Sequence, residues 1–440
     1  MRKHLTNAVC GFLDYASYPV GMLLVAPIIL HRLGAAEYGL WMIATSAVSA
    51  GGIIASGFCD ASIQRVAHLR GIGEASSLEH TVRGILGINL VLGFMLAAGA
   101  WVAAPYAASH IATSNLPSWR ECVISLRIAS VLILVRSVES VGVSTQRAFE
   151  QYRSTVQISA IMRLLTLSSA AVLAISGRRT VSILMTTGIF LLLGATLQFH
   201  GARKFLGDVS LRPTFQSDET RILLKLGVFV WLQAVGGVIF GQLDRILLGI
   251  YLGAAAVAPY SLCVQFAHPL FGATASGLHF LFPYLSGRAE TISNITLRQT
   301  VLKAFLCNLL LVVSGASALL LFGNRLILLW AGAPVAQNAA RIFKPIILAS
   351  ALMGLSVTGT YAMQALSLFR TVALITLASR AAMLLLMIYL LNRFGLQGLA
   401  TARVCYGVAA LSLYLPLAYE FRIRGKISSP VTSMGISQDI

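Results

Sequence analysis

Long apolar segments recur along this chain of 440 residues. A transmembrane helix needs about 20 mostly apolar residues, and each of these segments reaches that length or passes it. Six lie before a polar stretch at residues 201–223, and six lie after it. They cover roughly residues 8–30, 39–59, 82–105, 122–143, 156–176 and 181–200, and then 224–250, 254–284, 300–322, 340–364, 371–391 and 396–419. The pattern predicts an all-α membrane protein with about 12 transmembrane helices.

The two halves of the chain share a short pattern. Leu33-Gly34-Ala35-Ala36 follows the first segment, and Leu252-Gly253-Ala254-Ala255 follows the seventh. We therefore expect two related six-helix bundles at residues 1–200 and 224–421, joined by a cytoplasmic linker at 201–223. Residues 422–440 are expected to form a polar cytoplasmic tail. Parallel repeats of this kind place a substrate site between the halves, near the middle of the membrane.

Composition and charge agree with a membrane protein. Hydrophobic residues make up 57% of the chain and charged residues 11%, whereas about a quarter of a soluble domain is charged. The net charge is +18. If the N-terminus lies in the cytoplasm, the cytoplasmic segments hold about twice as many Lys and Arg as the other side. This bias places both termini in the cytoplasm. The basic residues are scattered along the chain, so nucleic-acid binding is not predicted.

Several kinds of chemistry lack their sequence signals. The chain has no GxxxxGK[ST] motif for ATP and no HExxH motif for zinc. Its six cysteines form neither a CxxC motif nor a cluster with histidine. Carboxylates are too sparse for the pairs that a hydrolase needs. We therefore predict no catalytic residues, no cofactor and no metal site, and we expect that the protein is not an enzyme.

Four arginines lie inside apolar segments: Arg136, Arg163, Arg380 and Arg403. If all of them faced lipid, insertion would cost on the order of 10 kcal/mol. We therefore expect them to line a cationic cavity, because guanidinium groups bind phosphate with two parallel hydrogen bonds. Structural alternatives stay open. Arg136 has Glu139 three residues later and can pair with it, and Arg403 can extend toward the membrane surface.

Three intramembrane acids, Asp14, Glu139 and Asp244, are candidates for coupling or gating, because such acids mark proton and cation pathways. The alternative for each is a structural hydrogen bond to a neighbouring helix. Arg245 directly follows Asp244 and so lies on another face of the helix, which means that any partner of Asp244 comes from another helix. Gln265 and His268 share a helix face, and interhelical hydrogen bonds are the favoured interpretation for both.

Two motifs resemble a known family. The second half contains Gln242-x-Asp244-Arg245, then Gly249, Gly253 and Tyr260, and the first half contains Gly34 followed by Glu37-Tyr38-Gly39. The chain resembles the polysaccharide-biosynthesis exporters, the O-antigen flippase (Wzx-like) family of the multidrug/oligosaccharidyl-lipid/polysaccharide (MOP) superfamily. The resemblance extends over nearly the whole chain. One departure is Pro259, since a non-proline residue usually precedes the tyrosine.

The resemblance implies a multi-pass protein of the bacterial inner membrane with a V-shaped cavity between two bundles. Its substrate would be a polyprenyl-pyrophosphate-linked oligosaccharide, a repeat unit of O-antigen (and so of lipopolysaccharide) or of exopolysaccharide. Alternating access would carry this unit across the membrane lipid. A complex with a polysaccharide polymerase and a chain-length regulator stays open. The alternative functions are a cation-coupled multidrug antiporter of the same superfamily and a membrane polysaccharide polymerase or glycosyltransferase.

Overall fold

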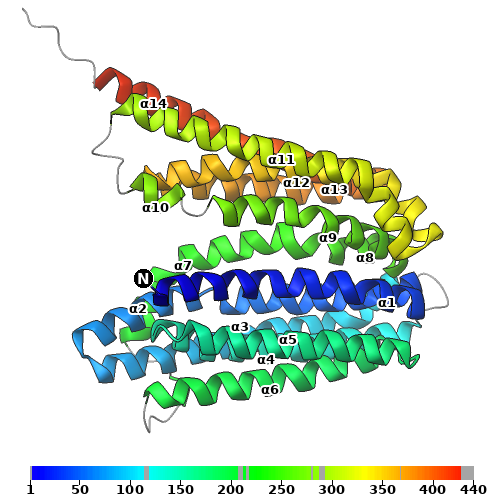
Figure 1. Cartoon of the computed structure of the whole chain (residues 1–440). Coiled ribbons are helices and arrows are strands. Elements are labelled where there is room, and N and C mark those ends of the chain that lie inside the picture. The colour runs from blue at the N-terminus through cyan, green and yellow to red at the C-terminus, as the bar shows by residue number, and fades with distance from the viewer. Residues whose placement is uncertain are drawn as a thin grey trace, which may run out of the picture.

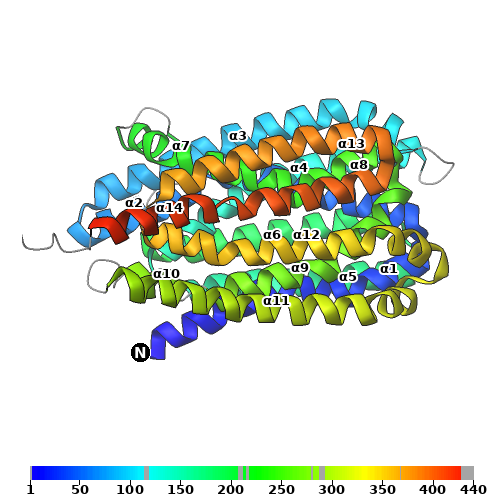
Figure 2. The same cartoon turned by 90° about the horizontal axis from the view of Figure 1, so that it is seen from above.

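The apolar segments form long helices that run side by side, and no strand occurs among the described residues (Figures 1 and 2). The structure is a computed structural model that describes residues 2–112, 118–206, 212–214, 218–278, 281–286, 293–366 and 368–427. Side chains are described from residue 21 onward, apart from some later positions that include Asp60 and Gln233.

The helices follow the order of the predicted segments. The first half contains α1 (Arg2–Ser56), α2 (Cys59–Ile72), α3 (Ala75–Ile111), α4 (Trp119–Ala148), α5 (Tyr152–Ile175) and α6 (Thr180–Leu206). The second half contains α7 (Asp218–Val238), the π-helix η1 (Ile239–Leu243), α8 (Asp244–Leu252), α9 (Ala254–Gly277), α10 (Leu281–Ser286), α11 (Asn294–Ala331), α12 (Ala333–Ala365), α13 (Phe369–Leu411) and α14 (Tyr414–Ile427).

These helices supply the predicted crossings. Eight helical stretches in the described part of the chain are long and apolar enough to cross a membrane. Two of them count twice, because α1 reverses direction at Gly34 and α13 reverses at Gly395. The helices α4 and α9, with 30 and 24 residues, are also long enough to cross. The predicted all-α fold with about 12 crossings in two six-helix bundles is confirmed.

The predicted correspondence between Gly34 and Gly253 is confirmed in the backbone. Gly34 has φ 85° and ψ 171°, and Gly253 has φ 82° and ψ 169°. A side chain beyond hydrogen makes this conformation unfavourable, so glycine is the residue that adopts it readily. Each glycine reverses the chain between two crossings. The second crossings also correspond, since α1 breaks before α2 at Gly57-Phe58 and α9 breaks before α10.

Apolar packing joins the two halves at one end of the molecule. The largest buried cluster contains Tyr38 and Trp41 of the first half together with Leu248 and Tyr260 of the second. At the other end the buried clusters are separate. One joins Ile85 of the first bundle to Leu223 of α7, and the other lies between α10, α14 and their neighbours in the second half. We call these two ends the closed end and the open end. The open end contains α2, α10 and the last turn of α14 (Figure 1).

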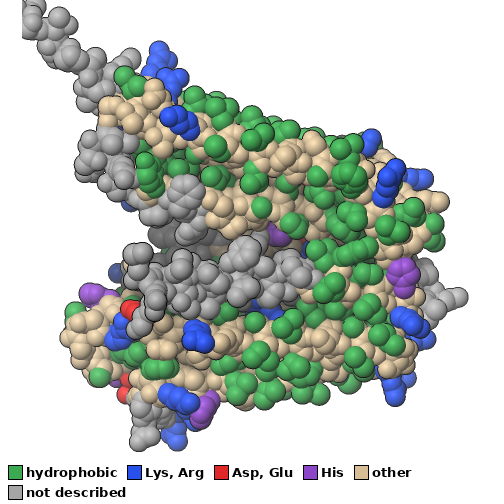
Figure 3. All heavy atoms as spheres, in the orientation of Figure 1, with side chains coloured by type: hydrophobic (Ala, Val, Ile, Leu, Met, Phe, Trp, Pro, Cys, Tyr) green, Lys and Arg blue, Asp and Glu red, His purple; other side chains and the backbone are tan. Residues whose placement is uncertain are grey.

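The surface follows the same division. Figure 3 shows two bodies with a hollow between them at the open end and a continuous surface at the closed end. The molecule is therefore V-shaped, with a cleft between the bundles.

Two glycines let the halves meet at the closed end. A Cβ atom on Gly39 would lie 1.8 Å from the carbonyl oxygen of Ala254. A Cβ atom on Gly249 would lie 2.3 Å from Cδ1 of Ile43. The first pair joins the second crossing to the eighth, and the second pair joins the second crossing to the seventh. This contact between the halves therefore depends on residues without a side chain.

Replacing Gly39 with alanine is expected to loosen the closed end. The added methyl group meets a backbone carbonyl that cannot rotate away, and such overpacking costs about 1–3 kcal/mol. Thermal unfolding of the purified protein in detergent should show a lower midpoint for Gly39→Ala. Gly99→Ala is the matched control, because Gly99 also lies in a helix and no atom comes within 4 Å of its added Cβ. Equal midpoints for the two variants would contradict the close contact.

Candidate functional site

The seventh crossing is interrupted close to the middle of the molecule. The helix α7 contains Gly236 and Gly237 near its end, and the π-helix η1 follows and contains Gly241. A π-helix turn is rare and often marks a functional site. Asp244 begins α8 directly after this turn. The irregular backbone therefore leads to the carboxylate that the sequence singled out.

Asp244 is fully buried and receives two partners from other helices. The hydroxyl of Tyr260 on α9 donates a short hydrogen bond to Oδ2 of Asp244. Arg403 on α13 places Nη2 3.5 Å from the same oxygen. The Arg403 guanidinium also lies 5.7 Å from the centre of the Tyr260 ring. A buried carboxylate needs such partners to stay charged.

Arg403 is itself buried, with 4% of its surface exposed. The alternative in which Arg403 extends to the membrane surface is therefore wrong. Its partner Asp244 comes from another helix, as the position of Arg245 predicted. The two charged side chains form an ion pair inside the second half.

Arg245 and Gln265 point to the first half instead. Arg245 donates from Nη1 to Oγ of Ser46 on α1 at 3.5 Å. Gln265 on α9 donates from Nε2 to the hydroxyl of Tyr38 at 3.0 Å. The predicted interhelical hydrogen bond of Gln265 is confirmed, whereas His268 is exposed and its ring lies 6.1 Å from that of Phe271. These bonds add polar contacts to the closed end.

Arg380 lies on α13 beside α7. Its Nε donates to the hydroxyl of Tyr406 at 3.4 Å. A Cβ atom on Gly236 would lie 3.1 Å from Nη1 of Arg380, so the glycine leaves room for the guanidinium. Tyr406 follows Arg403 by three residues and shares its helix face. Arg380, Tyr406 and Arg403 are therefore neighbours around the interrupted crossing.

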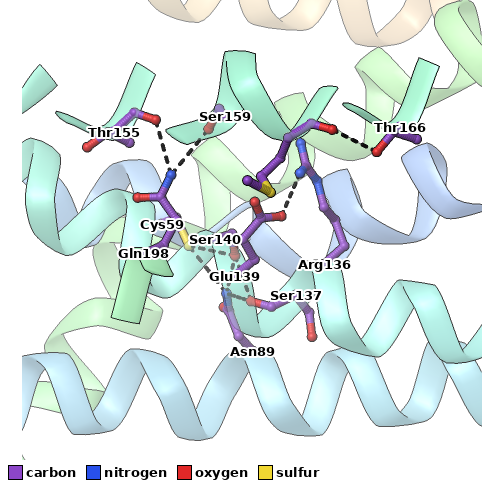
Figure 4. A network of polar contacts seen from close by, with 11 residues as sticks. Cys59, Asn89, Arg136, Ser137, Glu139, Ser140, Thr155, Ser159, Thr166 and Gln198 are labelled. Atoms are coloured by element: carbon purple, nitrogen blue, oxygen red, sulfur yellow. Dashed lines mark hydrogen bonds and ion pairs between the residues drawn. The ribbon is translucent and has the colours of Figure 1, made fainter. Parts of the chain in front are cut away.

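Arg136 and Glu139 pair with each other in the first half (Figure 4). Nη1 of Arg136 lies 2.6 Å from Oε2 of Glu139, and the Arg136 side chain is 44% exposed against 5% for Glu139. The pairing alternative for Arg136 is therefore confirmed.

A polar network surrounds this pair in Figure 4. Asn89 donates to Ser140 and to the carbonyl oxygen of Ser137, and Gln198 donates to Ser159 and to the carbonyl oxygen of Thr155. These bonds tie α3 to α4 and α5 to α6.

The polar residues around the interrupted seventh crossing form one group, the central cluster: Asp244, Arg245, Tyr260, Arg380, Arg403 and Tyr406. The remaining two candidates lie apart from it. Arg163 is half-buried on α5 in the first half. Asp14 lies in the first part of α1, and its side chain is outside the described residues. The structure thus brings together Arg380, Arg403 and Asp244 from the predicted set and leaves Arg136, Glu139 and Arg163 in the first bundle. The described residues contain no group of three or more His, Cys, Asp or Glu side chains that could hold a metal.

Sequence reasoning missed three members of the cluster: Tyr260, Tyr406 and Arg245. Tyr260 was visible only as part of a motif, because its role depends on the turn at Gly253 that brings α9 back along α8. Arg245 served only to place the partner of Asp244 on another helix, and its bond to the first half was not predicted. No local signal identifies Tyr406, since Arg380 lies 26 residues before it.

A family model described as "Polysaccharide biosynthesis protein" matches residues 29–332 of the chain. The chain belongs to this family. The matched range contains Gly34, Gly39, Asp244 and Tyr260, which form the closed end and the core of the cluster. Among curated proteins, no sequence matches the chain.

Several solved structures of the MOP superfamily have the same fold. An inward-facing MATE-family multidrug resistance transporter is 15% identical with a TM-score of 0.71, over 95% of this chain and 99% of that one. The lipid II flippase MurJ in an inward closed conformation is 13% identical with a TM-score of 0.74, over 96% and 90% of the chains. An outward-facing MATE-family transporter is 13% identical and reaches 0.57, over 93% and 96%.

Removing the guanidinium of Arg403 is expected to destabilise the protein strongly. The Arg403→Met variant leaves the buried Asp244 carboxylate without its cation, a change that costs about 3–5 kcal/mol. Thermal unfolding should show a large fall in the midpoint, and the double variant Asp244→Asn/Arg403→Met should recover part of it. Arg179→Gln removes an exposed ion pair with Glu121 and should change the midpoint little. A double variant as unstable as Arg403→Met would contradict the pairing.

Proposed function

We propose that this protein is a lipid-linked oligosaccharide flippase of the bacterial inner membrane. It moves a polyprenyl-pyrophosphate-linked repeat unit of O-antigen or exopolysaccharide from the cytoplasmic to the periplasmic leaflet. Membership in the polysaccharide biosynthesis family supports the class of substrate. The similarity in fold to MurJ, a lipid II flippase, supports the transport step.

The observation that carries the proposal is the group of three guanidinium side chains around the interrupted seventh crossing. Arg245 donates to Ser46, Arg380 donates to Tyr406, and Arg403 pairs with Asp244. A pyrophosphate carries the opposite charge and accepts bidentate hydrogen bonds from arginine. In this interpretation Arg380 binds the pyrophosphate, together with Arg163 of the first bundle. Arg403 and Arg136 pair with Asp244 and Glu139, so their contribution to substrate binding is smaller.

We infer the state of the transport cycle from the cleft. Both termini and the linker at 201–223 lie in the cytoplasm in this proposal, so the open end faces the cytoplasm. The higher TM-score against the inward-facing MATE-family transporter than against the outward-facing one supports this assignment. The bundles at residues 1–200 and 224–421 then move relative to each other, and the tail at 422–440 stays in the cytoplasm. Differential affinity of the substrate for the two states shifts their populations.

The acids have a secondary part in this cycle. In this proposal Asp244 gates the closed end, because its hydrogen bond from Tyr260 holds α8 to α9 and its ion pair with Arg403 holds α8 to α13. Glu139 and Asp14 are the remaining candidates for coupling to an ion gradient. The alternative function, a cation-coupled antiporter, has in its favour the fold of the MATE-family transporters. An antiporter for cations requires an acidic cleft, and the arginines around Asp244 favour an anion.

The leaflet distribution of lipid-linked oligosaccharide tests the proposal directly. In a strain that lacks the gene, intact repeat units should accumulate on the cytoplasmic face, and a plasmid copy should clear them. Accumulation of single units on the periplasmic face would instead indicate a polymerase. An unchanged distribution together with increased drug sensitivity would indicate the antiporter.

Arg380→Gln should fail to clear the accumulated lipid in the same assay. The change removes the charge that meets the pyrophosphate, whereas Arg380→Lys keeps it and should restore part of the activity. Arg393→Gln is the control on the same helix, because Arg393 is exposed and its guanidinium lies over the ring of Tyr389. Full clearance by Arg380→Gln at normal protein levels would remove Arg380 from the binding site.

A further inference from the structure

Helix α7 begins the second half of the chain, yet its first part packs against the first bundle. Leu223 is fully buried in a cluster with Phe58. A Cβ atom on Gly227 would lie 2.4 Å from the Phe58 ring. Trp231 donates from Nε1 to the carbonyl oxygen of Ile54 at 2.9 Å. At the open end α7 is therefore held by α1 and the turn that leads into α2.

An ion pair fixes the first turn of α7 to the same bundle. Arg65 on α2 donates two hydrogen bonds to Glu219, from Nε to Oε2 and from Nη2 to Oε1, both at 2.8 Å. Thr81 on α3 donates a third at 3.3 Å. The Arg65 and Glu219 side chains are 22% and 13% exposed. A bidentate guanidinium–carboxylate pair has the strongest geometry of its kind, and partial burial reduces screening by salt.

The carboxylate of this pair is charged under physiological conditions. The hydrogen bond from Arg65 is the main cause that lowers the pKa of Glu219 below its ordinary value. Its ordinary value already lies near 4.3, so Glu219 is ionised at neutral pH. The pair therefore persists as a charged contact in the resting protein.

The chain that leads into α7 is fixed to the same place. Arg83 on α3 donates from Nε to the carbonyl oxygen of Arg212 at 2.8 Å. The backbone N–H of Thr214 donates to the carbonyl oxygen of Arg83 at 3.3 Å. The described part of the linker and the start of α7 are thus both bound to the first bundle.

A second face of α7, turned about 100° from the face that packs on the first bundle, is apolar and exposed. Leu224, Val228 and Leu232 lie on successive turns and are 45%, 38% and 39% exposed. Gly236, one turn later on the same face, lies against Arg380 of α13. At the open end in Figure 1, α7 lies on the side of the first bundle, and α12 and α13 lie on the other side of α9. The residues Leu224, Val228 and Leu232 form an apolar stripe on the same face of α7 as Gly236, which contacts α13.

We propose that Arg65 and Glu219 form an ionic latch that holds the cleft open. With the latch closed, α7 stays on the first bundle and its apolar stripe is separated from the start of α13. When the latch opens, the first part of α7 moves to α13, Leu224 and Val228 approach Phe369, and the open end narrows. This inference goes beyond the proposed function, because it names the contact that holds one state and does not depend on the substrate.

Distances between spin labels in the full-length protein test the latch. Labels at Arg221 on α7 and Phe369 on α13, in a variant without native cysteines, report the separation of the two helices in liposomes. Glu219→Gln and Arg65→Gln should each increase the ratio of short to long distances about fivefold, the size expected for a partly exposed bidentate pair. The exchanged pair Arg65→Glu/Glu219→Arg should return the ratio toward that of the unaltered protein.

The matched control is Glu420→Gln, which removes the Glu420–Arg424 pair within α14, where the side chains are 24% and 33% exposed. It should leave the distances unchanged. The latch is refuted if both latch variants keep the original distribution, or if Glu420→Gln shifts it equally. This experiment and the transport assay can fail independently. If the protein moves no oligosaccharide but the latch variants change the distance ratio, the flippase proposal is refuted and the latch is supported.

Discussion

A carboxylate among apolar helices imposes the strongest constraint on this structure. Asp244 is fully buried, and the free energy of burying its charge becomes acceptable only with a cation and a hydrogen-bond donor in place. Arg403 and Tyr260 fill these roles from two other helices. The pair therefore determines how α8, α9 and α13 are placed relative to one another. Arg245, next in sequence, faces the other way and bonds to Ser46, so the same turn also fixes the second half to the first.

The V shape follows from where small residues occur. At the closed end Gly39 and Gly249 allow backbone and side chains of the other half to approach within contact distance, and the apolar core runs across both halves. At the open end the buried clusters are separate. The first part of α7, although it follows the first half in the chain, packs against the first bundle there. Contact at one end with separation at the other is the arrangement that a rocking motion needs, because each end then has two alternative packings.

Much of this architecture was predictable from local patterns. Segment lengths gave the crossings, and the pattern around Gly34 and Gly253 gave the repeat, since a reversal between two helices requires a residue that tolerates positive φ. Charges inside apolar segments indicated buried polar contacts. The partners could not be predicted, because Asp244 and Arg403 are separated by most of the second half and their pairing depends on helix rotation. The position of α7 was also hidden: chain order assigns it to the second bundle, while Glu219 and Trp231 bond to the first.

Charge balance links the cluster to the transport cycle. Ion pairs that are complete within one bundle, such as Arg136 with Glu139, add little attraction for a substrate. Arg245 and Arg380 contact other helices or segments instead, because Arg245 donates to the hydroxyl of Ser46 and Arg380 donates to the hydroxyl of Tyr406. A dianionic headgroup in the cleft would be attracted to these guanidinium groups, and the low dielectric of the surroundings would strengthen the attraction. Since Arg245 reaches from the second half to the first, an anion that drew it away from Ser46 would weaken the closed end. Binding of the substrate would then favour the opening through which it leaves.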